Sequence, residues 1–391
     1  MNIMNKSMIL FSIMVLIYCG KTKKTKLEVK EKKQIEVNIN RTIETFLILR
    51  SISDDDPLFQ YRDSTYRGKP IMYESRKAFA DYRNHPAVEE TQKLLNSTSS
   101  TGDLILQGLL YFDELPSINQ RFEIDSEFWK SRKDTLINYI SAIGKFYEET
   151  KVDEFIDNNI DFYNKAKAEA KSYLDDNLIP TLEEYFGIQN HAYKMLLIPN
   201  SPFRMGFGAS VKSDKGDIFY QIISPANDIE WNKNSTYITY GFSGKGASEY
   251  YRDLVVHEFC HPFVTPYIDS DKLKSEIAKT DSLFVPKLDS IMSKQGYNSW
   301  WGFVNEHLVR LGEIRVAKAM KIQDLDAMRK YNVENGFILL PEAEELVMRY
   351  ESNRKKYPTF QDFIPILINQ LETFNKQQIN NRLQQRTKDM K

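Results

Sequence analysis

Residues 254–261 read LVVHEFCH, with two histidines four positions apart and a glutamate directly after the first. Side chains four positions apart lie on one face of an α-helix, so His257 and His261 can direct their imidazole nitrogens at one metal ion. Glu258 lies one step round the helix, where it can take a proton from a metal-bound water without binding the metal itself. Zinc suits two imidazoles and a carboxylate and lowers the pKa of bound water, so the pattern predicts a Zn²⁺ site.

Two features favour this hypothesis over a chance histidine pair on a surface helix. The chain contains only five histidines, so a chance match to the pattern is rare. The three residues before His257 are apolar, which is typical of a buried helix. We therefore expect the motif to lie on a helix at the floor of a cleft.

The composition is typical of a globular protein with a sizeable core. Of the 391 residues, 41% are hydrophobic and 13% are aromatic, which supplies enough apolar surface for one large domain or two. The formal net charge of −1 gives no indication of a nucleic-acid partner or of an acidic polymer.

Residues 1–19 resemble a bacterial lipoprotein signal peptide. Lys6 gives a basic start, and residues 8–17 form an almost continuous apolar run shortly before Cys19. The run is shorter than the about 18–20 apolar residues that a membrane-spanning helix needs. Tyr18 departs from the lipoprotein pattern, which prefers a small residue directly before the lipidated cysteine. Plain secretion and an uncleaved anchor are the alternatives.

The resemblance implies export to the periplasm or the cell surface, with lipid on Cys19 holding the protein to a bacterial membrane, expected to be the outer membrane. Residues 20–35 carry seven lysines, which is typical of a flexible tether. The chain has two cysteines, so lipid on Cys19 leaves Cys260 without a disulfide partner. Cys260 is interpreted as a small buried hydrophobic residue.

The N-terminal part of the exported chain, residues 36–187, is predicted to be mainly helical. It begins with a short strand at 37–39, where apolar and polar residues alternate. Apolar residues then recur at helical spacing in four main stretches, at 42–52, 87–95, 125–150 and 152–186.

The character of the sequence changes near residue 187, and residues 188–391 are predicted to contain a sheet followed by helices. Short runs rich in β-branched and aromatic residues predict strands at 194–198, 205–211, 217–223 and 236–240. Asp214-Lys215-Gly216 is expected to turn a hairpin, which gives a small, mostly antiparallel sheet. Helices after the motif are expected at 272–295, 300–320, 341–354 and 360–387. The result is an α+β fold in which both regions pack as one unit.

This order, with a sheet before the H-E-x-x-H helix and further helices after it, resembles the zincin metallopeptidases. If the third zinc ligand is a glutamate that follows the motif in the chain, the site resembles that of the gluzincin branch. Residues 36–380 also resemble an uncharacterised family of bacterial secreted proteins and lipoproteins that carries the same motif. Pro262 departs from the metallopeptidase pattern, and it is expected to end or bend the helix directly after His261.

A catalytic zinc usually takes three protein ligands and one water, so one further ligand is required. Residues 300–313 read WWGFVNEHLVRLGE and predict a buried helix on which Glu306, Arg310 and Glu313 share a face. Glu306 resembles the gluzincin ligand, and Glu313 is the main alternative, followed by Asp269 and His307. The other interpretation of Glu306 is an ordinary ion pair with Arg310.

The resemblance implies hydrolysis of peptide bonds in a peptide or protein substrate. Glu258 is expected to act as the general base, and the sequence offers Tyr267, His307 and Tyr240 as donors for the developing oxyanion. Zincins bind extended substrate along an edge strand, and Gly206-Phe207-Gly208 is the candidate because glycines permit close backbone approach.

Two other function classes are compatible with the sequence. A binding or scaffolding lipoprotein could retain the fold without turnover, although the intact His257, Glu258 and His261 argue against it. A zinc amidase could act on a non-peptide amide in cell-wall material, and only the substrate distinguishes it from a peptidase.

Overall fold

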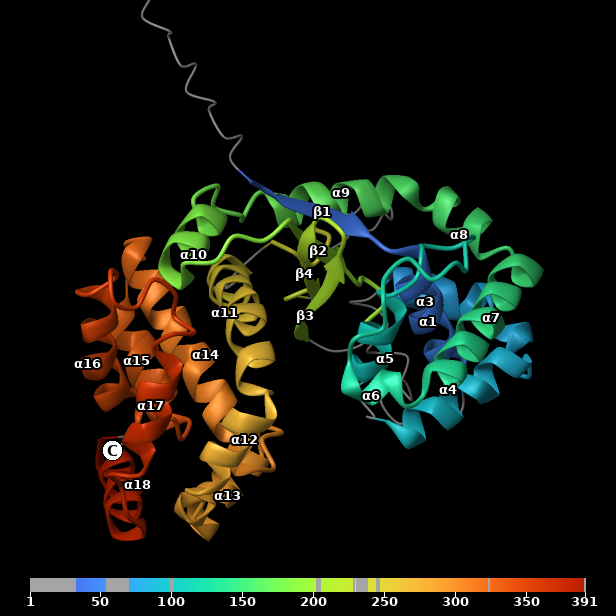
Figure 1. Cartoon of the computed structure of the whole chain (residues 1–391). Helices are drawn as coiled ribbons and strands as arrows, with labels where there is room; N and C mark the ends of the chain where they lie inside the picture. Colours follow the sequence, from blue (N-terminus) through green and yellow to red (C-terminus); the bar gives the residue numbers. More distant parts are fainter. Residues whose placement is uncertain are drawn as a thin grey trace, which may run out of the picture. The chain divides into compact units, whose positions relative to one another are not determined.

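The computed structural model describes residues 33–53, 70–98, 102–201, 205–227, 229, 238–243, 247–322 and 324–389 (Figure 1). The predicted signal peptide, the predicted lipidation site Cys19 and most of the predicted tether lie outside these residues. Residues 33–391 form one compact unit. No helix among the described residues is both long enough and apolar enough to cross a membrane.

A sheet of four strands lies at the centre of the fold, in the order β1-β2-β4-β3. Its strands are β1 (Ile35–Ile39), β2 (Ala192–Leu197), β3 (Gly206–Ser213) and β4 (Gly216–Ile223). The α+β class is confirmed, but the expected mostly antiparallel pairing is wrong. β1 pairs with β2 and β2 with β4 in parallel, and only the β3–β4 hairpin is antiparallel.

The parallel pairing of β1 with β2 is consistent with the connection between them. The chain leaves β1 into a long helical region before it enters β2 alongside, and parallel neighbours need such crossovers. The predicted strand at 236–240 lies partly outside the described residues, and its described part, residues 238–240, is irregular.

Helices precede and follow the sheet, as the sequence predicts. Those between β1 and β2 are α1 (Arg41–Ile52), α3 (Pro70–Ala78), α4 (Pro86–Ser97), α5 (Asp103–Leu109), α6 (Glu127–Lys130), α7 (Lys133–Thr150), α8 (Val152–Asn158), α9 (Ile160–Lys171) and α10 (Leu178–Phe186). Those after β4 are α11 (Ala247–Ile268), α12 (Asp271–Ala278), α13 (Pro286–Ser293), α14 (Trp300–Ala319), α15 (Leu325–Glu334), α16 (Leu340–Glu351), α17 (Ile364–Leu371) and α18 (Lys376–Asp389).

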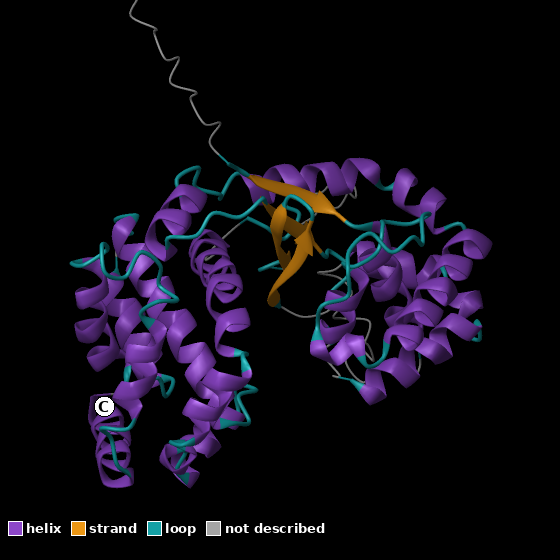
Figure 2. Cartoon of the chain, viewed as in Figure 1, coloured by secondary structure: helices purple, strands orange, loops and turns teal. Residues whose placement is uncertain are grey.

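The two faces of the sheet bury their side chains in two separate cores, since successive residues of a strand point to opposite faces. Tyr193, Met195 and Leu197 of β2 pack with residues of α10, α11 and α14. Leu196 and Ile198 pack with residues of α1, α4, α5 and α7. Figure 2 shows the strands between these two groups of helices. Both faces are therefore covered, which explains why β2 and β4 are apolar on both sides.

The loop before the motif helix α11 is held by one carboxylate. Glu169 on α9 accepts hydrogen bonds from the backbone N–H groups of Tyr240, at 3.0 Å, and Phe242, at 2.8 Å. The Ser243 hydroxyl donates to the same carboxylate. Glu169 thereby connects the helical region before the sheet to the segment that leads into the candidate site.

The motif helix does not end at Pro262. α11 continues to Ile268 with Pro262 and Pro266 inside it. A proline removes one helical hydrogen bond, to the carbonyl four residues earlier. The helix is sustained here by burial, because Phe263, Val264 and Ile268 beyond the proline are each no more than 1% exposed.

A buried carboxyl group lies in the core on the α1 side of the sheet. Glu44 is fully buried, and its Oε2 accepts hydrogen bonds from Tyr163, at 3.0 Å, and from Asn200. Asn200 Oδ1 in turn accepts from Ser75. Burial raises the pKa of Glu44 to about 7, although the two hydrogen bonds favour the ionised form.

The raised pKa of Glu44 predicts a pH-dependent stability. Because the folded-state pKa lies above the unfolded value of about 4.3, the Glu44 contribution is most favourable below that pH and declines as pH rises to about 7. Glu44→Gln removes the titration, so the free energy of unfolding of the variant should improve relative to wild type by up to about 3 kcal/mol between pH 5 and pH 8. Urea unfolding at several pH values measures this difference. Glu148→Gln, at an exposed position of α7, is the control and should show no such trend.

Candidate metal centre

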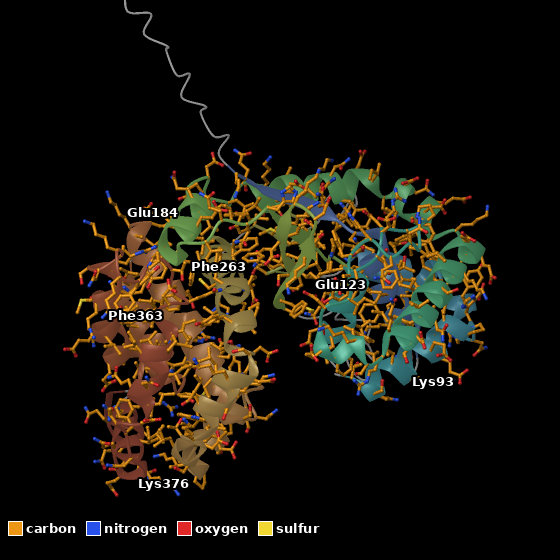
Figure 3. All side chains as sticks on the ribbon, viewed as in Figure 1. Lys93, Glu123, Glu184, Phe263, Phe363 and Lys376 are labelled. Atoms are coloured by element: carbon orange, nitrogen blue, oxygen red, sulfur yellow. The ribbon has the colours of Figure 1, made fainter. Side chains whose placement is uncertain are left out.

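The motif residues lie where α11 packs against α14. One side of α11 is anchored in the core at Phe263 (Figure 3). The Phe263 ring stacks on Phe186 at 4.5 Å and meets Phe219 edge-on at 5.0 Å. The side of α11 that carries the motif is also buried, since His257 and Glu258 are only 8% and 7% exposed. Burial of both sides fixes the motif side chains in position.

The three residues expected as ligands come together between the two helices. His257 Nε2 lies 3.3 Å from Glu306 Oε1, and His261 Nε2 lies 3.7 Å from Glu306 Oε2. One ligand atom from each residue lies within 4.8 Å of the others. This buried group could hold a metal ion, and its donor set of two imidazoles and a carboxylate fits zinc.

The remaining ring nitrogen of each histidine has a partner of its own. His257 Nδ1 lies 3.0 Å from Glu313 Oε2. His261 Nδ1 lies 3.2 Å from Thr265 Oγ1, and Thr265 donates to Asn305 Oδ1 at 2.9 Å. These partners favour the tautomers with hydrogen on Nδ1, which leaves both Nε2 lone pairs free for a metal.

Glu313, the alternative ligand, therefore contacts the far side of His257 instead of the ligand cluster. Glu306 and Glu313 are seven positions apart on α14 and face the same side, so the sequence could not separate them by helical position. The structure separates them by distance, because Glu306 reaches both Nε2 atoms and Glu313 reaches only the Nδ1 of His257.

The ion pair between Glu306 and Arg310 is also present. Arg310 Nη2 lies 2.8 Å from Glu306 Oε1, and its other terminal nitrogen donates to Asn332. The guanidinium carbon lies 4.5 Å from the centroid of the Phe337 ring. Glu306 thus stands between a fixed cation on one side and two imidazoles on the other, so the two interpretations of this residue are compatible.

At Glu306 and His257, the neighbouring charges shift the pKa in the direction opposite to burial. Burial alone would raise the pKa of Glu306, but His257 and Arg310 lower it to about 2. Burial alone would lower the pKa of His257, but Glu306 and Glu313 raise it to about 9. Without a metal, His257 is therefore positively charged at neutral pH, with a proton on Nε2 as well as on Nδ1, and an incoming metal ion must displace the Nε2 proton.

Glu258 is directed toward the edge strand β3. Burial raises the pKa of its carboxyl group to about 7, and the backbone N–H of Gly208 acts in the opposite direction as a hydrogen-bond donor. A carboxyl group whose pKa is near the working pH is suited to accept and return a proton.

Two glycines allow β3 to lie directly on α11. A Cβ at Gly206 would come within 2.8 Å of the Leu254 side chain, and one at Gly208 would lie 2.6 Å from the backbone oxygen of Glu258. Alternate residues of a strand are about 6.6 Å apart and helical residues four apart about 6 Å, so the two glycines match Leu254 and Glu258 in turn.

The metal centre opens into a cleft of about 500 Å³. The expected substrate-binding residues Gly206, Phe207 and Gly208 line it, and β3 is the edge strand of the sheet. Asp103 and Gln107 of α5 contribute a polar wall. The cleft thus brings together the ligand cluster, Glu258 and a strand edge.

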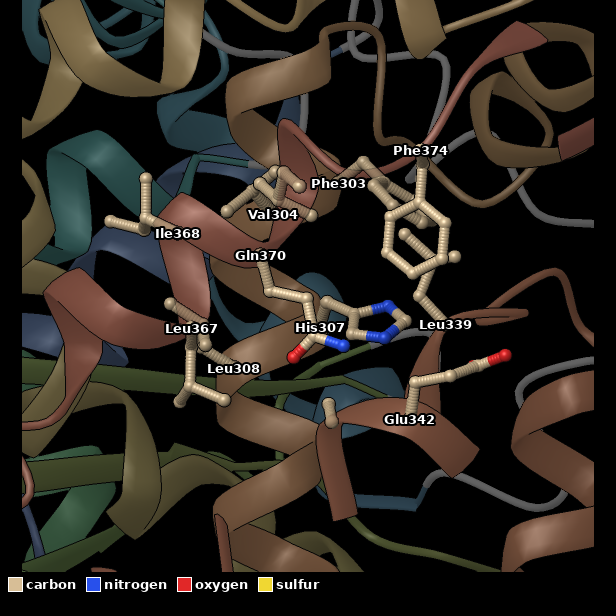
Figure 4. A pocket seen from close by; sticks show the side chains of 12 residues that line it. Phe303, Val304, His307, Leu308, Leu339, Glu342, Leu367, Ile368, Gln370 and Phe374 are labelled. Atoms are coloured by element: carbon tan, nitrogen blue, oxygen red, sulfur yellow. The ribbon is translucent and has the colours of Figure 1, made fainter. Parts of the chain in front are cut away.

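The residues expected to stabilise an oxyanion are not in this cleft. Tyr267 is partly buried against the hydrophobic core and is not among the cleft-lining residues, and the same is true of Tyr240. His307 points into a different pocket (Figure 4), since adjacent residues of a helix diverge by about 100°. Burial lowers the pKa of His307 to about 4. Asp269 pairs with Lys274 at 2.7 Å instead of joining the ligand cluster.

The sequence analysis overlooked Tyr297. Its side chain lines the cleft and interacts with Glu306 and Arg310, and burial together with the charge of Glu306 raises the pKa of its hydroxyl. Tyr297 precedes α14 directly after a turn at Gly296, where φ is +92°. A tyrosine in a turn carries no functional signal by itself, but its closeness to the start of the ligand helix could have drawn attention to it.

Fold and site together define an α+β protein with a buried two-histidine, one-carboxylate centre on paired helices. The chain belongs to the family described as a domain of unknown function (DUF4932), whose model matches residues 115–370. That match spans β2 to β4, the motif helix and both glutamates of α14. No curated protein and no solved structure matches the chain.

The geometry predicts different effects for the two glutamates of α14. Glu306→Ala should abolish zinc binding, because it removes a ligand from the cluster. Glu313→Ala should weaken binding by about 10–100-fold, as is typical for loss of a group that orients a metal-bound histidine. Isothermal titration with zinc measures both. Equal losses in the two variants would contradict this assignment.

The close contact at Gly208 predicts that Gly208→Ala lowers the stability of the fold without affecting zinc binding. Gly208→Ala places a methyl group within 2.6 Å of Glu258 backbone oxygen, so β3 or α11 must shift. We expect a loss of about 1–3 kcal/mol in the free energy of unfolding, as for other overpacked sites, with zinc stoichiometry unchanged. Urea unfolding and zinc titration measure the two quantities. Ser210→Ala on the same strand is the control, and an unaltered stability of Gly208→Ala would refute the contact.

Proposed function

We propose that this protein is a zinc-dependent peptidase that hydrolyses peptide bonds in extended substrates. The observation that carries the proposal is the position of Glu258. Its buried carboxyl group lies beside the ligand cluster of His257, His261 and Glu306, on a cleft that the edge strand β3 also lines.

His257, His261 and Glu306 would hold the zinc ion, with Glu313 and Thr265 fixing the orientation of the two imidazoles. Zinc supplies Lewis-acid chemistry at such a site, which activates water and polarises a carbonyl. Arg310 keeps Glu306 ionised and ready to bind the cation.

Glu258 acts as the general base and then as the general acid. It takes a proton from the attacking water as the new carbon–oxygen bond forms, and it returns that proton to the leaving amine as the carbon–nitrogen bond breaks. Its pKa of about 7 is matched to both transfers at neutral pH.

Tyr297 takes the role of hydrogen-bond donor for the charge that develops on the scissile carbonyl. Its hydroxyl lies in the cleft beside Glu306, where the residues first considered for this role are absent. Loss of one such donor typically lowers kcat by about 10²–10³-fold, so Tyr297→Phe separates this role from a purely structural one.

The edge of β3 that pairs with no strand among the described residues binds the substrate backbone. An extended peptide can add to an exposed sheet edge through main-chain hydrogen bonds, which requires little of its side chains. The N-terminal sequence supports action outside the cytoplasm, with lipid on Cys19 as the membrane anchor.

Glu258→Gln tests the mechanism. Zinc stoichiometry should be retained, and cleavage of a quenched fluorescent peptide library should fall by at least about 10²-fold, because the general base is lost. His261→Ala is the matched control and should lose zinc as well as activity. Full activity in Glu258→Gln would exclude the mechanism, and a zinc-loaded wild type that cleaves no peptide would exclude the peptidase.

A further inference from the structure

A second pocket lies on the other side of α14 from the metal centre. We call it the His307 pocket. Figure 4 shows the imidazole of His307 at its centre, with Gln370 and Glu342 nearby. Its walls are otherwise mainly apolar and include Phe303, Val304, Leu339, Leu367, Leu371 and Phe374.

The polar side chains of this pocket are incompletely paired. One ring nitrogen of His307 donates to the backbone carbonyl of Leu339, and among the described residues the other has no hydrogen-bond partner, although His307 is only 6% exposed. Gln370 Oε1 and Glu342 Oε2 are also buried without a partner. Glu342 Oε1, in contrast, pairs with Arg382.

Several unpaired polar atoms in one pocket are unusual, because buried polar atoms are nearly always hydrogen-bonded. Three side chains from α14, α16 and α17 contribute these atoms to one pocket. An apolar side chain at each position would avoid the penalty of an unpaired polar group. Their presence in one place therefore points to a molecule that pairs with them.

The available atoms specify what that molecule must offer. The one N–H of the neutral imidazole donates to Leu339, so its other nitrogen and the oxygens of Gln370 and Glu342 are all acceptors. A hydroxyl group can donate to one of these acceptors. A cation is less suitable, because Arg382 already lies beside Glu342.

The size and entrance of the pocket limit the rest of the ligand. Its space of about 30 Å³ exceeds the about 10–15 Å³ that one water requires but is well below the about 150 Å³ of a cavity that binds benzene, so only a group of hydroxyl size fits inside. The side chain of Glu342 is 31% exposed, so the pocket is reached from the surface. A compact body can thus remain at the apolar entrance while its hydroxyl group reaches inward.

We propose that the His307 pocket binds a small neutral hydroxyl compound with an apolar body, its hydroxyl group directed at His307, Gln370 and Glu342. The aromatic rings of Phe303 and Phe374 suit an aromatic body. The site is independent of zinc and of peptide hydrolysis.

Phenol is the probe, and anisole is its matched control because it replaces the hydroxyl hydrogen by a methyl group. Titration of the full chain should give saturable phenol binding and a rise in Tm, with anisole at least 10-fold weaker. Equal binding of both compounds, or no saturable phenol binding, would overturn the proposal.

Variants locate the binding. Ala343→Leu fills the pocket, and Gln370→Leu removes an acceptor while keeping a similar size, so each should weaken phenol binding at least 10-fold. Gln370→Leu also tests folding, because loss of an unpaired atom should leave Tm equal or higher without phenol. Ala168→Leu, at an exposed position of α9, should leave binding unchanged. Undiminished phenol binding in Ala343→Leu would place the site elsewhere and refute the assignment.

Discussion

A single buried carboxylate, Glu306, determines the arrangement between α11 and α14. An ionised carboxylate at 2% exposure is stable only if cations or hydrogen-bond donors surround it. Arg310 provides a permanent charge on the same helix, and His257 and His261 approach from the other helix. The contact between the two helices is thus electrostatic at the site and apolar around it. A bound divalent metal ion would replace the proton of His257 and add one net positive charge beside Glu306.

The edge strand is the second element on which the site depends. Pro262 has no backbone N–H, so the carbonyl of Glu258 lacks its usual helical partner, and that oxygen is the atom nearest to Gly208. The residue that departs most from the metallopeptidase pattern therefore lies where helix and strand meet. The Gly208 N–H and the Glu258 carboxylate complete the contact. The position of the proposed base is set by β3 as much as by its own helix.

The sequence was most informative where function depends on local spacing. His257, His261 and the placement of Glu306 on a buried helix follow from helical periodicity, and the structure brings them together. Pairing across the sheet depends on contacts between residues far apart, such as Ile35 with Tyr193, and spacing carries no information about them. The same limit explains Tyr267 and His307, which are near the ligands in sequence but point elsewhere. Tyr297 was missed because only the folded chain brings a turn residue to Glu306.

The glycines of β3 have a consequence for the rigidity of the cleft. Glycine loses more backbone entropy on folding than any other residue, by about 0.5–1 kcal/mol relative to alanine at such positions. A stiffer residue at Gly206 or Gly208 would require Leu254 or the backbone of α11 to shift, because α11 occupies the space of a side chain. The strand nearest to the metal centre is consequently the one with the weakest intrinsic preference for an extended backbone. Among the strands that the structure describes, only β4 pairs with it, and a peptide paired along its other edge would supply the order that its own sequence lacks.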